Sequence, residues 1–347
     1  MTTLDILLPE PLRGSGGHRT VISNAERFAA AGHRVRLHIQ KRRRQRDPVA
    51  KTVEWFGVEH CAVMQGWPDA LPDSDAVMAT AWHTARAVAT MDTPARRLYF
   101  VQDYEPVFHP AGDTSVEVAG TYALGLDTLV IGNWLRHKLW DDHRVSTASV
   151  PFTADLSIYR PGVESRRRQV AAIYQPDKPR RCPDLVARTL RLVLEAGVEV
   201  VTYGSSKSPS LGSGHRHAGL LETADLAALY QRSSAGLCLS ASNPSRVPFE
   251  MMACGLPVVE ALLPNTVFDL PDSACLLAPP TPESLARAVL RVVHSDPRKW
   301  HGAAYMAARP QPLEAQAFEA FVLADTVTFD ALPEATYPRS TWKSDGR

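Results

Sequence analysis

The residues with the clearest chemical potential lie in one run, Ser240-Ala-Ser-Asn-Pro-Ser-Arg-Val-Pro-Phe-Glu250-Met-Met-Ala-Cys-Gly255-Leu-Pro-Val-Val259. We expect a polar turn at 243–245 and a short helix over 249–254, because proline suits a first helical turn and glycine ends helices. Backbone N–H groups at such a turn can bind an anion such as a diphosphate. Glu250, about one turn into the helix, is better placed to accept hydrogen bonds from hydroxyl groups, such as those of a ribose. The combination favours nucleotide recognition; an ordinary helix carboxylate on an α/β crossover is the alternative.

Cationic and small residues follow two other apolar runs of the second half. Tyr174-Gln-Pro-Asp-Lys-Pro-Arg-Arg181 follows the first run, and arginine side chains suit phosphate oxygens. A solvated charge cluster is the alternative. Tyr203-Gly-Ser-Ser-Lys207 follows the second run, and its small residues could pack against a nucleobase. Lys207 would then lie near phosphate or hydroxyl oxygens.

Three polar segments follow apolar runs in the first half. The glycines of Gly14-Ser-Gly-Gly-His-Arg19 allow a ligand to approach the backbone closely. Arg19, however, stands where a dinucleotide-binding fingerprint has its last glycine. A flexible turn without a ligand is the alternative. Thr80-Ala-Trp-His-Thr84 makes His83 a candidate substrate contact, although a lone histidine is more often structural. Gln102-Asp-Tyr-Glu105 places two carboxylates after a buried run, which is costly unless they are solvated or used. A polar loop is the alternative for this segment.

Apolar runs alternate with helical patterns in both halves of the chain. The pattern predicts strands at 4–8, 35–39, 76–79, 98–101, 129–131, 170–174, 198–203, 237–239 and 257–259, and helices at 19–31, 184–196, 223–232, 282–294 and 313–326. This alternation predicts an α/β protein with parallel sheets covered by helices. We expect two doubly wound domains at 1–155 and 169–330, a linker at 156–168 and a poorly ordered tail at 331–347. Ligands bind beyond the carboxyl ends of such strands, so the polar segments should face a cleft.

The composition excludes some classes of function. A net charge of +1 over 347 residues gives no argument for nucleic-acid binding. The basic runs Lys41-Arg-Arg-Arg44 and Arg166-Arg-Arg168 are expected to be solvated loops, with contact to an anionic membrane or acidic acceptor as the alternative. Five scattered cysteines without a CxxC pair predict free thiols in a reducing compartment. The start of the chain lacks a signal-peptide pattern and no run is long enough to span a bilayer, so we expect a cytoplasmic protein with at most peripheral membrane contact.

The run Glu250-Met-Met-Ala-Cys-Gly-Leu-Pro-Val-Val259 resembles the donor-site segment of the retaining family-4 glycosyltransferases. Tyr99-Phe-Val-Gln-Asp-Tyr-Glu-Pro-Val-Phe-His-Pro-Ala-Gly112 and Gly132-Asn-Trp-Leu135 resemble a bacterial rhamnosyltransferase branch of that group. The resemblance implies the GT-B fold, in which two Rossmann-like domains face a central cleft. It also implies transfer of a sugar from a nucleotide-diphosphate donor with retention of configuration, without a metal or other cofactor. The implied donor is a deoxyhexose linked to dTDP, and rhamnose is the first candidate for the sugar.

The resemblance also assigns roles to residues. His83, Asp103, Glu105 and Arg181 are the catalytic candidates, with Asp103 and Glu105 on the acceptor side. The donor-site candidates are Gly16, Gly17, Arg180, Arg181, Tyr203, Gly204, Lys207, Ser242, Asn243, Ser245 and Glu250. Two positions depart from the pattern: Gln175 stands where the group usually has arginine, and Ser242 stands where many members have glutamate.

The sequence is compatible with two other functions. A nucleotide-sugar epimerase of the same fold would convert its donor without an acceptor, and a non-catalytic nucleotide-sugar-binding protein would bind without turnover. Gln175 and Ser242 keep the second alternative open. The acceptor could be a glycan, a lipid-linked sugar, a protein or a small molecule.

Overall fold

A computed structural model describes residues 1–41, 47–163, 166–325 and 332 of the chain. The described residues divide into two compact units: Met1–Pro151 with Pro312–Leu332 form the first, and Phe152–Gln311 form the second. Most of the basic run at 41–44 and of the expected tail at 331–347 lies outside the described residues.

The first unit is a parallel sheet covered by helices. Its described strands are β1 (Thr3–Leu8), β2 (Arg34–Ile39), β3 (Ala62–Gln65), β4 (Ala76–Ala79), β5 (Arg96–Val101), β6 (Asp127–Ile131) and β7 (Thr147–Val150). Its described helices are α1 (Gly16–Ala30), α2 (Pro48–Phe56), α3 (Trp82–Thr90), α4 (Asp113–Gly120), α5 (Asn133–His143) and α11 (Gln311–Leu323), with the 3₁₀ helices η1 (Glu105–Phe108) and η2 (Thr121–Ala123). The strand order is β3-β2-β1-β4-β5-β6-β7, and β1 pairs in parallel with both β2 and β4.

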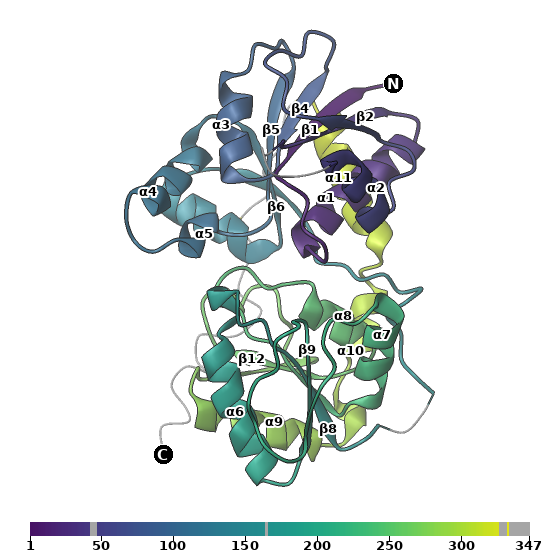
Figure 1. The fold of residues 1–347 in the computed structure, drawn as a ribbon, viewed down its shortest axis with the longest axis vertical. Helices are drawn as coiled ribbons and strands as arrows, with labels where there is room; N and C mark the ends of the chain where they lie inside the picture. Colours follow the sequence, from purple (N-terminus) through teal and green to yellow (C-terminus); the bar gives the residue numbers. More distant parts are fainter. Residues whose placement is uncertain (42–46, 164–165, 326–331, 333–347) are drawn as a thin grey trace. The chain divides into compact units, whose positions relative to one another are not determined.

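The helix α11 returns to the first unit from the far end of the chain, and it lies beside α1 in Figure 1. The Phe318 ring packs 6.3 Å from the ring of Phe28 and 5.9 Å from that of Phe100. Asn24 Nδ2 donates to Glu314 Oε1 at 2.8 Å. The sequence placed this segment in a domain at 169–330; the structure divides the chain differently, because the apolar side chains of α11 pack against the first unit.

The second unit repeats the same architecture. Its described strands are β8 (Gln169–Ile173), β9 (Glu199–Tyr203), β10 (His215–His217), β11 (Ala235–Leu237), β12 (Val258–Ala261) and β13 (Cys275–Ala278). Its described helices are α6 (Pro183–Glu195), α7 (Thr223–Arg232), α8 (Val247–Ala253), α9 (Pro282–Val293) and α10 (Gly302–Ala307), with the 3₁₀ helices η3 (Pro179–Arg181) and η4 (Pro297–Lys299). The strand order is β10-β9-β8-β11-β12-β13, with every pair parallel. The core lies between this sheet and the helices α6 and α9, which are neighbours in Figure 1.

The strand orders place a ligand-binding position in each unit. In the first sheet the order reverses between β1 and β4, and in the second it reverses between β8 and β11. Both follow the doubly wound pattern, in which ligands bind beyond the carboxyl ends of the strands at such a switch point. The segments that follow β1, β4, β8 and β11 are therefore the candidate ligand-binding segments.

Three local expectations are corrected by the structure. The helix α1 begins at Gly16 instead of 19, because the Ser15 side chain caps it by accepting the His18 N–H at 3.3 Å. β11 ends at Leu237, so Cys238 and Leu239 belong to the turn that follows. Arg166, expected to be solvated, is half-buried and donates to the carbonyls of Tyr230, Ser233 and Cys254, near the ends of α7 and α8.

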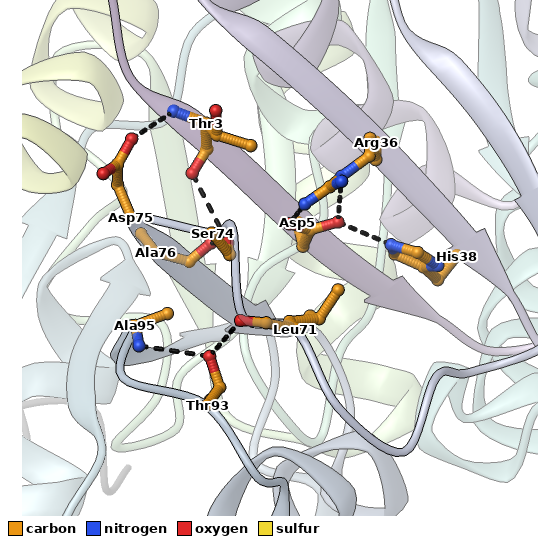
Figure 2. A network of polar contacts seen from close by, with 10 residues as sticks. All are labelled: Thr3, Asp5, Arg36, His38, Leu71, Ser74, Asp75, Ala76, Thr93 and Ala95. Atoms are coloured by element: carbon orange, nitrogen blue, oxygen red, sulfur yellow. Dashed lines mark hydrogen bonds and ion pairs between the residues drawn. The ribbon is translucent and has the colours of Figure 1, made fainter.

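Figure 2 shows a buried ionic group that joins β1 to β2. Arg36 donates to both carboxylate oxygens of Asp5, at 2.7 and 2.6 Å, and His38 Nε2 lies 2.6 Å from Asp5 Oδ1. The Asp5 side chain is fully buried. Burial alone would raise the pKa of this carboxyl, but the hydrogen bonds from His38 and Arg36 outweigh it and hold the pKa below 3.8. The ionised form of Asp5 therefore stabilises the first unit.

The Asp5→Asn variant should lower the free energy of unfolding of the first unit by about 1–3 kcal/mol, because Arg36 and His38 lose a charged acceptor. Since the folded state depresses the Asp5 pKa, this stabilisation is complete above the unfolded pKa and fades as pH falls through the folded value. Urea unfolding followed by tryptophan fluorescence measures it, since Trp55, Trp67, Trp82, Trp134 and Trp140 all lie in the first unit. Asp69→Asn, at an exposed position, is the matched control. Equal unfolding midpoints for both variants at pH 7 would contradict the role given to Asp5.

Candidate functional site

Two turns meet at the switch point of the second unit. The first, residues 178–181, follows β8 and is called the cation turn because it holds Lys178, Arg180 and Arg181. The second, residues 240–245, follows β11 and is called the serine turn. The Ala241 N–H donates to the Arg180 carbonyl at 2.8 Å, which fixes the two turns against each other. The segments in which the sequence predicted a diphosphate site are thus brought together by neighbouring strands.

The cation turn concentrates positive charge in a half-buried position. It is closed by hydrogen bonds from the Lys178 N–H to the Gln175 carbonyl at 3.0 Å and from the Arg181 N–H to the Lys178 carbonyl at 2.9 Å. Burial, and then the charges of Arg180 and Arg181, lower the pKa of Lys178 to about 8. Within the described residues, neither Lys178 nor Arg181 forms an ion pair with a carboxylate. Such a cluster attracts an anion, and a bound anion would relieve the repulsion among the cations.

The serine turn is mostly buried and is held by several hydrogen bonds. Asn265 Nδ2 donates to the Ser240 carbonyl at 2.8 Å and also to the Ser242 carbonyl. Ser240 Oγ donates to the Asn243 carbonyl at 3.0 Å, and the side chains of Ser242 and Asn243 are buried. Ser245 Oγ lies 3.7 Å from Cys238 Sγ. These contacts fix the backbone conformation of the turn.

Glu250 lies in the first turn of α8, as the sequence predicted. The helix runs over Val247–Ala253 instead of 249–254, and it has only seven residues. A helix this short offers a weak dipole, so the cation turn is the stronger attraction for an anion.

Of the predicted residues at the end of β9 and after it, some lie near the cation turn and one lies in the core. Gly204 has a φ of +96°, and an added Cβ would lie 3.1 Å from Ile173 Cγ1, so the position requires glycine. Its carbonyl accepts a hydrogen bond from Gln175 Nε2 at 3.3 Å, which places Gly204 next to the segment after β8. Tyr203, a predicted donor contact, is buried, and its hydroxyl lies 2.7 Å from that of Tyr230. The Lys207 Nζ is exposed and pairs with Asp177 at 2.6 Å.

In the first unit the predicted residues gather at the carboxyl ends of β1, β4 and β5. Gly16 and Gly17 form the start of α1, and a Cβ added to Gly17 would lie 3.7 Å from the Gln102 amide. His83 lies in the first turn of α3, with its ring 5.6 Å from that of Trp67 and 5.4 Å from that of Trp82. The structure thus brings Gly17 next to the segment after β5 and surrounds His83 with aromatic rings.

The two predicted carboxylates of the first unit make structural hydrogen bonds. Glu105 Oε2 accepts the Trp82 N–H at 2.7 Å, at the start of α3, and Asp103 Oδ1 accepts the Tyr104 N–H at 2.9 Å. Burial raises the pKa of Tyr122, and the charge of Glu105 adds to this effect. Hydrogen bonds to the backbone, one of them at the start of α3, therefore offset the free-energy cost of placing two carboxylates after a buried strand.

Three residues at or beside the two turns of the second unit were not among the predicted site residues. Lys178 lies two positions before Arg180, in a segment whose predicted phosphate contacts were its arginines. Glu260 is a charged residue inside the apolar strand β12, a pattern that signals a special environment. Asn265 gave no sequence signal, because its contacts with the serine turn exist only in the folded chain.

Two features are absent from the described residues: a cluster of metal-binding side chains and a membrane-spanning helix. No group of three or more His, Cys, Asp or Glu side chains in this part of the chain is arranged to hold a metal ion. In the same residues, no helix combines the length and apolar character needed to cross a bilayer.

Comparison with known proteins gives a family model that matches part of the second unit and a curated relative that matches a longer stretch of the chain. A family model described as the C-terminal domain of WsaF matches residues 168–290, which include both turns. The O-antigen biosynthesis protein RfbC of Myxococcus xanthus is 34% identical over 226 residues. That match covers 62% of this chain but only 18% of RfbC, so the chain spans less than a fifth of this relative's length.

Solved structures share the architecture of both units. TarM of S. aureus, in a complex that contains UDP, has a TM-score of 0.70 at 9% identity, over 93% of this chain and 100% of TarM. HepE of Anabaena, in complex with UDP-glucose, has a TM-score of 0.66 at 12% identity, over 93% of this chain and 98% of HepE. The fold is that of the GT-B glycosyltransferases. The GT-B prediction made from the sequence is thus confirmed.

Lys178 gives a direct test of the electrostatics in this GT-B unit. In protein whose lysines carry ¹³C-labelled methyl groups, NMR titration should show one lysine resonance with a midpoint near 8, about two units below an ordinary lysine. Lys178→Gln should remove that resonance and so assign it. In Arg181→Gln the midpoint should rise, because one repelling charge is gone. An ordinary midpoint for Lys178 would contradict the cation cluster.

Proposed function

We propose that the chain is a glycosyltransferase that uses a nucleotide-diphosphate sugar as its donor. The observation that carries the proposal is the hydrogen bond between the Ala241 N–H and the Arg180 carbonyl, which places the cation turn against the serine turn at a switch point. A diphosphate matches this site in charge, and the neighbouring Glu250 offers an acceptor for ribose hydroxyls.

The relatives support the donor class. RfbC is named as an O-antigen biosynthesis protein, HepE was solved with UDP-glucose and TarM with UDP. The proposal of a dTDP-linked deoxyhexose as the donor, with rhamnose as the first choice of sugar, rests on the resemblance of residues 99–112 and 132–135 to the rhamnosyltransferase branch. We propose a glycan or lipid-linked sugar as the acceptor, with a protein or small molecule as the alternatives.

The proposed reaction breaks the bond between the anomeric carbon and the diphosphate oxygen and forms a bond to an acceptor oxygen on the same face, so configuration is retained. The departing phosphate takes the acceptor's proton. Arg181 and Lys178 stabilise the charge that develops on the leaving diphosphate. This route assigns no task to a metal ion. It also needs no carboxylate base, which agrees with the structural use of Glu105 in the first unit.

The first unit is proposed to hold the acceptor. Its candidate surface contains the start of α1, with Gly16 and Gly17, and the aromatic surroundings of His83. Asp103 and Glu105 shape this surface through their hydrogen bonds to Tyr104 and Trp82. In the second unit, Ser242 makes the contacts to the sugar hydroxyls differ from the common pattern of the group that the sequence resembles, and Gln175 removes one cationic contact to the diphosphate.

Arg181→Ala should reduce the turnover number about 10²–10³-fold, the usual effect of removing one preorganised charge-stabilising donor. Glu250→Ala should weaken donor binding, because a ribose hydroxyl loses its acceptor. Steady-state kinetics and donor titration measure the two effects. Arg216→Ala, at an exposed position on β10, is the matched arginine control. Unchanged turnover and donor affinity in both site variants would overturn the donor site.

Product analysis with a panel of nucleotide sugars and glycan acceptors tests the activity itself. Sugar transfer to an acceptor, with the anomeric configuration retained, is the expected result. Donor conversion in the absence of any acceptor would establish the epimerase alternative. Binding without turnover across the panel would establish a non-catalytic binding protein.

A further inference from the structure

Glu260 is a buried acid directly beneath the serine turn. Its strand neighbours Val259 and Ala261 pack in the core against α6 and α9. Because strand side chains alternate between faces, Glu260 points away from that core. Its side chain is fully buried, with 0% exposure, and none of the roles assigned above uses it.

One oxygen of Glu260 holds the serine turn in place. Oε1 accepts the Ser240 N–H at 3.1 Å and the Ala261 N–H at 2.9 Å. Ser240 is followed by Ala241, whose own N–H donates to the Arg180 carbonyl. The carboxyl of Glu260 is therefore connected, through two consecutive residues, to the cation turn.

The other oxygen of Glu260 and one nitrogen of Arg181 are in an unusual situation. Glu260 Oε2 and Arg181 Nη1 are both buried, and within the described residues neither atom has a hydrogen-bond partner. The two side chains interact electrostatically, yet they form no ion pair in the part of the chain that the structure describes. Buried polar atoms are nearly always paired, so two such atoms on interacting side chains indicate a place for a further group, such as a water or a donor oxygen.

We propose that Glu260 is a positioning residue of the donor site: its carboxyl holds the serine turn beside the cation turn, and its charge opposes the anion that these cations bind. This inference rests on the proposed function. Its consequence is that donor binding requires the neutral form of Glu260.

The surroundings of Glu260 fix the sign of this effect. Burial raises the pKa of Glu260 to about 8, against the smaller opposing effects of the Ala261 and Ser240 N–H groups and of Arg181. The titratable neighbours that interact with it are Arg181, Cys182, Cys238 and Cys275, and burial raises the pKa of all three thiols above 9.0. Glu260 is thus neutral at pH 7 and gains a charge above pH 8. A bound diphosphate raises its pKa further, so binding above pH 8 requires proton uptake.

Lys178 would produce a similar pH dependence, since its pKa is also about 8 and an anion favours its charged form. Lys178→Arg separates the two groups, because an arginine keeps its charge throughout this range. We would measure the affinity of the full chain for dTDP-glucose by calorimetry between pH 7 and 9. The diphosphate diester of this probe keeps its charge over that range.

In Lys178→Arg the affinity should still fall, by about tenfold at pH 9, one unit above the Glu260 pKa. In the double variant Lys178→Arg with Glu260→Gln the affinity should be constant, because glutamine preserves the acceptor for Ser240 without a titrating group. A constant affinity in Lys178→Arg would overturn the inference even if Glu260→Gln fails to fold. Equal slopes in the single and double variants would also overturn it.

The same binding measurements distinguish a failure of the proposed function from a failure of the role of Glu260. If the wild-type chain binds neither dTDP-glucose nor UDP-glucose at pH 7, the donor site is wrong, and this inference is overturned with it. If it binds with an affinity that does not depend on Glu260, only the role of Glu260 is overturned.

Discussion

The hydrogen bond from the Ala241 N–H to the Arg180 carbonyl is the constraint on which the candidate donor site of the second unit depends. It joins two turns that are distant in sequence and lie side by side because β8 and β11 are neighbours in the sheet. The bond is possible only because both strands run in the same direction and end at the same edge. Glu260 and Asn265 then hold the serine turn from the next strand and the loop after it.

The two units treat similar polar groups in different ways. At the switch point of the first unit, carboxylates are used for structure: Glu105 accepts the Trp82 N–H at the start of α3. In the second unit the cations lie close together, no carboxylate of the described residues pairs with Lys178, and burial raises the pKa of the nearby acid, Glu260, to about 8. This excess of positive charge at the switch point of the second unit is the feature that favours an anionic donor there in the proposed function.

The sequence predicted the fold because its apolar runs and helical segments alternate regularly in both halves. It missed short or exposed strands such as β3 and β10, whose residues carry little apolar signal. It also placed α11 in the wrong half of its domain scheme, since the contact of Phe318 with Phe28 is set by tertiary packing. At the candidate site, the sequence pointed to two segments that the structure does bring together, because each follows one of two neighbouring strands. It did not predict that the Tyr203 hydroxyl lies against that of Tyr230, and it gave no role to Glu260.

Hydrogen exchange of the full chain with and without a nucleotide sugar tests the central claim most directly. If the two turns form one diphosphate site, a saturating dTDP-linked or UDP-linked sugar should slow amide exchange in residues 175–182 and 240–246 together. The exposed edge strand β10 of the same unit should exchange at an unchanged rate. Binding that protects other segments and leaves both turns unchanged would contradict the account.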